Sequence, residues 1–74
     1  MTPAATAFAS RTITAFSGLL ALAVEQFDAA SHAVEAGDLA EAASRIRAAS
    51  DLAVTAFCSA RNLAETLDAE RVKP

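Results

Sequence analysis

One strong turn signal lies at the centre of the 74-residue chain, within residues 35–41, and it constrains the fold more than any other feature. Gly37 suits the left-handed position that ends a helix. Asp38 is a favourable N-cap for a following helix, and Glu41 three residues later completes the pattern of a capping box. Because so short a connection joins antiparallel neighbours, the chain is expected to reverse direction at this turn.

Apolar and small residues recur at alternating spacings of four and three on both sides of the turn, over residues 9–34 and 39–67. This spacing is typical of helices that pack side by side, as they do in coiled coils. The predicted fold is therefore all-α, with two long antiparallel helices at about residues 3–36 and 38–72. The hairpin accounts for the whole chain as one domain, residues 1–74.

The large members of these two series are expected to pack between the helices. Many of them would lie opposite alanines of the other helix, which allows the two helix axes to approach closely. The predicted intrachain seam consists of Ile13, Phe16, Leu20, Phe27, Val34, Leu39, Ile46, Leu63 and Leu67.

One seam does not accommodate all of the large apolar side chains, because a further group lies outside the series near the middle of both helices. Two packed helices leave much of their circumference exposed, and exposed apolar patches mark interaction surfaces. The alternative is a wide core face with scattered surface residues. The residues predicted to contact another chain are Leu19, Leu22, Val24, Leu52, Val54, Phe57 and Cys58.

The short length of the chain also favours a partner, since small domains bury little surface and often add a disulfide, a metal or a second chain. Cys58 is the only cysteine and His32 the only histidine, so neither an internal disulfide nor a Cys/His zinc site can form within one chain. The sequence therefore predicts a non-enzymatic protein–protein interaction module. It would be either a hairpin that dimerises into a four-helix bundle or a small subunit of a larger complex.

Glu25, Asp28, His32 and Glu35 recur at helical spacing along one face of the first helix. Histidine and carboxylate side chains at such spacing bind metals in some helix bundles. A metal- or cofactor-binding bundle that uses this acidic face is therefore the alternative function. A solvated acidic face is the favoured interpretation, and no cofactor is expected.

Charge, motifs and hydropathy argue against other functions. The net charge of −3 does not suit nucleic acid, which needs a basic surface. No nucleophile elbow or phosphate-binding glycine loop is present, so no enzyme is predicted. The uncharged residues 12–24 are fewer than the roughly 20 that a membrane span needs, so no membrane partner is predicted. One unpaired cysteine fits a reducing compartment and predicts a cytoplasmic protein.

Overall fold

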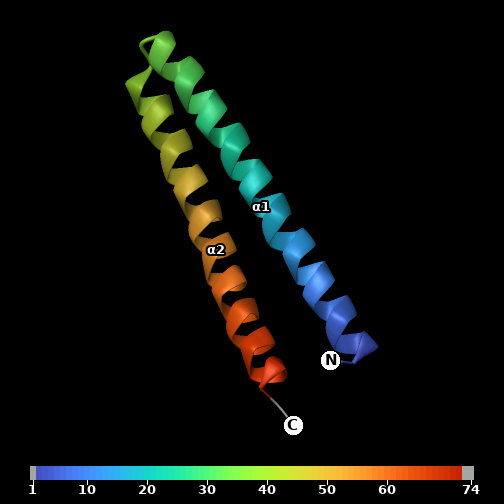
Figure 1. Ribbon diagram of the computed structural model, residues 1–74. Coiled ribbons are helices and arrows are strands. Elements are labelled where there is room, and N and C mark those ends of the chain that lie inside the picture. Colours follow the sequence, from blue (N-terminus) through green and yellow to red (C-terminus); the bar gives the residue numbers. More distant parts are fainter. Residues whose placement is uncertain (1, 73–74) are drawn as a thin grey trace.

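The computed structural model describes residues 2–72, which form two antiparallel α-helices joined by a tight turn. Helix α1 spans Pro3–Glu35 and helix α2 spans Leu39–Arg71. The helices lie side by side, and α1 begins at the end of the molecule where α2 finishes (Figure 1). The molecule measures 59 × 16 × 11 Å. The predicted all-α hairpin is confirmed, and each helix boundary lies within one residue of its predicted place.

The turn closes as the sequence predicts. Gly37 has a φ of +78°, in the left-handed region that a residue with a side chain rarely adopts. The Gly37 N–H donates to the Val34 carbonyl at 3.0 Å, and the Asp38 N–H donates to the Ala33 carbonyl at 2.8 Å. The Asp38 carboxylate then caps α2 by accepting a hydrogen bond from the Glu41 N–H at 3.0 Å. These bonds satisfy backbone groups that the ends of both helices would otherwise leave unpaired.

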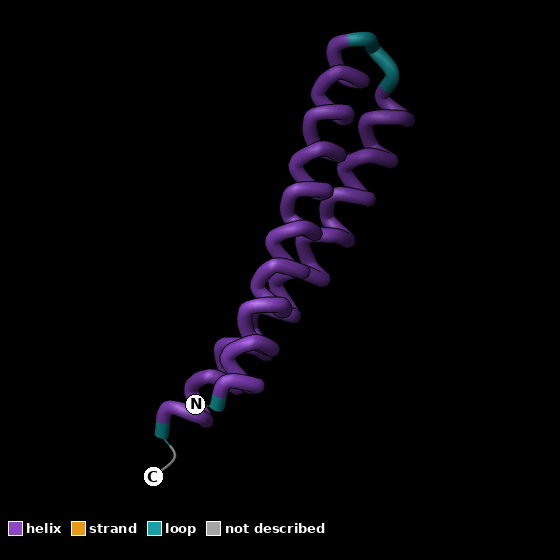
Figure 2. Tube along the Cα trace, turned by 90° about the vertical axis from the view of Figure 1, so that its right-hand side faces the viewer, coloured by secondary structure: helices purple, strands orange, loops and turns teal. Residues whose placement is uncertain are grey.

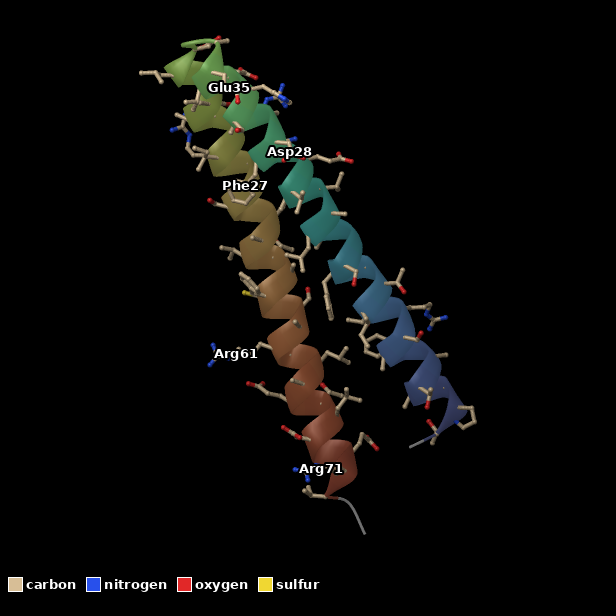
Figure 3. All side chains as sticks on the ribbon, turned by 45° about the horizontal axis from the view of Figure 1, so that its top comes forward. Phe27, Asp28, Glu35, Arg61 and Arg71 are labelled. Atoms are coloured by element: carbon tan, nitrogen blue, oxygen red, sulfur yellow. The ribbon has the colours of Figure 1, made fainter. Side chains whose placement is uncertain are left out.

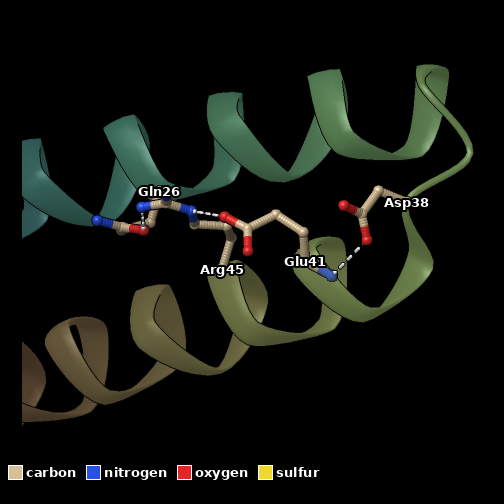
Figure 4. Close-up of polar contacts among 4 residues, drawn as sticks. All are labelled: Gln26, Asp38, Glu41 and Arg45. Atoms are coloured by element: carbon tan, nitrogen blue, oxygen red, sulfur yellow. Dashed lines mark hydrogen bonds and ion pairs between the residues drawn. The ribbon is translucent and has the colours of Figure 1, made fainter.

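The capping box is only half formed. The Asp38 N–H already donates to Ala33, so the Glu41 side chain turns instead toward Arg45, whose Nε lies 2.6 Å from Glu41 Oε1. Arg45 Nη1 also donates to Gln26 Oε1 at 3.2 Å, which places residue 26 opposite residue 45 (Figure 4). This chain of polar contacts links the two helices close to the turn and fixes their register there.

Alanine fills the contact between the helices. Among residues 2–72, the buried side chains are Ala9, Ala23, Ala30 and Ala33 of α1 and Ala42, Ala49, Ala56 and Leu63 of α2. We call this set the alanine seam. Its α2 members recur every seven residues, the repeat of helices that wind around each other. Accordingly, the helices are separated at the turn and overlap at the other end in the view of Figure 2.

The large residues predicted for the intrachain seam lie mostly at its edge rather than at its centre. Leu63 is buried, Phe16 and Leu67 are half-buried, and the other six are exposed. The exposed six are Ile13, Leu20, Phe27, Val34, Leu39 and Ile46. The physical reason is the small size of alanine, because two axes that approach over alanines leave no room for large side chains between them. The large neighbours therefore emerge on the flank of the pair.

Candidate interaction surface

The six exposed residues share one position in the seven-residue repeat. Each α1 member follows a residue that points toward α2, as Leu20 follows the half-buried Leu19, and Ile46 follows the half-buried Arg45 in the same way. Two antiparallel helices are related by an approximate two-fold axis that is perpendicular to the plane containing both helix axes. Rotation about this axis exchanges the helices but leaves each side of the plane where it was. Residues at the same position of the seven-residue repeat in the two helices therefore lie on the same side of the hairpin. All six residues therefore lie on the same side of the hairpin.

Two further side chains widen this surface. Val24 lies four residues after Leu20 and three before Phe27, so it is their neighbour on the surface of α1. Phe57 borders the same flank of α2 in the equivalent position. In Figure 3 the side chain of Phe27 reaches toward α2, whereas Arg61 projects away from α1. We call this surface the open face, and its residues are Ile13, Leu20, Val24, Phe27, Val34, Leu39, Ile46 and Phe57.

The open face is exposed along most of the hairpin. The exposed fraction of its side chains runs from 37% for Leu20 to 70% for Leu39. No charged residue belongs to it. An apolar surface that extends over most of a 59 Å molecule is unusual for a chain that works alone, and such surfaces mark sites of association.

The opposite flank is less apolar. It carries Phe8 and Leu22 of α1, but α2 contributes small or polar residues there, such as Thr55 and Asn62. Phe8 and Asn62 line a common hollow of about 230 Å³, which confirms that equivalent positions of the two helices share a side. An adjoining hollow of about 390 Å³ contains one ionisable side chain, that of Arg11. Neither hollow brings together the groups that acid–base or nucleophilic catalysis requires.

The residues predicted for an intermolecular interface do not share one surface in the structure. Leu19 and Leu52 are half-buried within the hairpin, and Val24 and Phe57 belong to the open face. The remaining three are exposed elsewhere. Leu22 lies on the opposite flank, and Val54 and Cys58 lie on the outer side of α2.

Most residues of the open face were predicted to lie between the helices, and the structure instead exposes them on the flank. Ala42, Ala49 and Ala56 form an unbroken column of small residues at seven-residue spacing. Such a column marks the line of closest approach, because only small side chains fit there. The large residues beside it then have to lie on the flanks.

The acidic face of α1 is exposed throughout. Glu25, Asp28, His32 and Glu35 occupy successive turns on the side away from α2, and Figure 3 labels two of them. Within residues 2–72, no group of three or more His, Cys, Asp and Glu side chains could hold a metal ion. The described part of a single hairpin therefore brings no three of these ligands to one point.

Helix α1 as a whole is longer than the uncharged segment considered above. Pro3–Glu35 is long and apolar enough to cross a membrane by length and composition, with a mean hydropathy of 1.5 in its most apolar window. Only 11% of that window is buried in the hairpin. Core helices and N-terminal signal sequences meet the same criterion, so this property does not assign a membrane role.

Comparison with protein-family models, with curated proteins and with solved structures found no match to this chain.

Proposed function

We propose that this protein is a self-association module in which two hairpins pack open face against open face to form a four-helix bundle. One observation carries the proposal. Eight large apolar side chains lie exposed on one side of the hairpin, whereas the alanine seam contains a single large residue, Leu63. The molecule thus resembles half of a bundle whose second layer is missing.

The energetics favour association. Full burial of a large apolar side chain contributes about 1.5–3 kcal/mol, so burial of the exposed half contributes about 1 kcal/mol. Two copies of the open face supply sixteen such side chains. This gross gain of about 16 kcal/mol compares with an estimated cost of about 4–15 kcal/mol for the lost translational and rotational freedom of two chains. The alanine seam contributes much less, because each alanine buries only one methyl group.

The dimensions of the open face also suit a second copy. The broad side of the hairpin measures 59 by 16 Å. Stable protein interfaces bury about 800 Å² on each partner, which is close to the area of that side. A second copy has an identical shape and an identical apolar surface, and two-fold pairing of the same patch is the commonest form of oligomer.

Nuclear Overhauser effects between chains test this proposal. A sample that mixes isotope-labelled and unlabelled chains reveals contacts across the interface without contacts inside one chain. We expect the Phe27 ring to show intermolecular contacts with aliphatic side chains, while Leu22 on the opposite flank shows none. Intermolecular contacts confined to Leu22 and Phe8, or a complete absence of them, would refute the proposal. A defined assembly that forms only when a different protein is added would favour the small-subunit interpretation instead.

A further inference from the structure

We infer that the second copy docks in the opposite direction, so that the turn of one hairpin lies over the open end of the other. This inference rests on the proposed self-association and adds its geometry. Two orientations bring open face to open face with two-fold symmetry. In the first the two turns lie together, and in the second they lie at opposite ends of the bundle. Two observations separate these orientations.

The first observation is the order of side-chain sizes along the open flank. Residues of α1 and α2 that are equally far from the turn lie opposite each other, as the Gln26–Arg45 hydrogen bond shows near the turn. We call each such pair of flank residues a level, numbered by its distance from the turn along the helix axes. Seven-residue spacing divides the column of this flank next to the alanine seam into five levels, and Val24 and Phe57 lie beside that column. From the turn outward they are Val34 with Leu39, Phe27 with Ile46, Leu20 with Ala53, Ile13 with Ala60, and Thr6 with Leu67. The bulkiest level is therefore the second, and the fourth contains an alanine.

If the two turns lie together, each level of one hairpin packs against the same level of its partner. The second level would then hold two phenylalanines and two isoleucines, and the fourth would hold two isoleucines and two alanines. Such unequal layers either overpack one end of the bundle or leave voids at the other, and both are unfavourable in a close-packed interior.

Packing with the turns apart removes this mismatch. The third level, Leu20 with Ala53, is the middle one, and it meets itself at the two-fold axis. The second level then meets the fourth, so that Phe27 lies over the partner's Ile13 and Ile46 lies over the partner's Ala60. Both of these layers contain one phenylalanine, two isoleucines and one alanine. Equal layers allow the four helix axes to keep one spacing along the whole bundle.

The second observation is the distribution of charge. Residues 20–54, the half next to the turn, contain six acidic residues and two arginines. Residues 2–19 and 55–72, the other half, contain three acidic residues and three arginines. Docking with the turns together would superimpose two halves that each carry a net charge of −4. Docking with the turns apart places each acidic half against a neutral one, which lowers the repulsion between the two chains, most of all at low salt, where screening is weak.

Distances between spin labels test the orientation. Glu35 lies on the outer side of α1 next to the turn, and Ala21 lies two repeats earlier on the same side, near the middle. Neither belongs to the open face, so a label at either position leaves that surface intact. Single cysteines are introduced as Glu35→Cys or Ala21→Cys together with Cys58→Ser, which removes the exposed native thiol. Pulsed electron paramagnetic resonance then measures the distance between the two labels of a dimer.

The two orientations predict different results for the Glu35→Cys label. With the turns apart, the labels are separated by about 30 residues of helix rise, or about 45 Å. With the turns together, they are separated only by the width of the bundle, about 20 Å. The Ala21→Cys control should give about 20 Å in either case. A short Glu35→Cys distance in a dimer would overturn the orientation alone, whereas a labelled chain with the mass of a monomer would overturn the proposed self-association as well.

Discussion

A negative charge placed on the open face should separate the two chains, and the structure supplies a control that is matched in exposure. Phe27 and Leu22 are both 48% exposed in the hairpin, yet they lie on opposite flanks. We compare Phe27→Glu with Leu22→Glu. In an isolated hairpin the two substitutions would have similar consequences, because each exchanges a half-exposed apolar side chain for a charged one. Only Phe27 lies where we place the second copy.

The expected loss of association free energy in Phe27→Glu follows from the exposed fraction of the Phe27 side chain. The half of Phe27 that remains exposed contributes about 1 kcal/mol when a partner covers it, and two-fold symmetry doubles this loss to about 2 kcal/mol. Partial desolvation of two unpaired carboxylates adds at least the cost of burying a neutral polar group, about 1 kcal/mol each. The total of about 4 kcal/mol corresponds to a roughly thousandfold weaker association, at about 1.4 kcal/mol for each factor of ten.

Light scattering coupled to size-exclusion chromatography measures the mass of each variant, and circular dichroism measures its helix content. We expect Phe27→Glu to elute as a monomer at concentrations where the unsubstituted chain and Leu22→Glu remain dimeric. The monomer should unfold at a lower temperature, because the alanine seam alone provides little apolar burial. If both variants kept the dimer, or if Leu22→Glu alone lost it, the assignment of the open face as the interface would be refuted.

Three further substitutions test the structure of the hairpin itself. Ala49 is fully buried in the alanine seam, so Ala49→Leu should lower the free energy of unfolding by about 1–3 kcal/mol through overpacking. Urea titration measures this change, with the exposed Ala21→Leu as a control, and an unchanged midpoint would show that the helices are not in close contact. The two glycines should respond with opposite signs. Gly37→Ala should destabilise by about 1–2 kcal/mol, because the φ of +78° strains a residue with a side chain. Gly18→Ala should stabilise by about 0.5–1 kcal/mol, because an added Cβ meets nothing within 4 Å inside the helix. Equal effects at both glycines would contradict this backbone argument.

The helices and the turn could be predicted from the sequence because local interactions determine them. Gly37 and Asp38 act within a few residues of their own positions, and the same is true of helix propensity in the alanine-rich segments on either side. The hydrogen bonds around the turn follow directly from those residues. Only the second half of the capping box differs, because the Asp38 N–H already donates to the Ala33 carbonyl and the Glu41 carboxylate pairs with Arg45 four residues later. Both competing partners are local, whereas the further bond from Arg45 to Gln26 depends on how the two helices pack.

The side of each helix that faces the other could not be predicted in the same way. The spacing of four and three describes two adjacent columns of α1 equally well, and the predicted seam uses the column that contains Leu20 and Phe27. The structure places the preceding column, with Leu19 and Gln26, toward α2. The choice depends on how closely the axes approach, and therefore on the alanines of α2. Apolar character alone does not distinguish a residue that belongs inside the hairpin from one that belongs between two hairpins.

Sedimentation equilibrium of the unsubstituted chain tests most directly whether the hairpin associates with itself. The chain has a mass of 7.6 kDa. We expect a single species of twice that mass, which dissociates reversibly on dilution and keeps its helix content while it is dimeric. A helical species that retains the mass of one chain at concentrations of hundreds of micromolar would contradict the proposed self-association, because the open face would then be stable in contact with water.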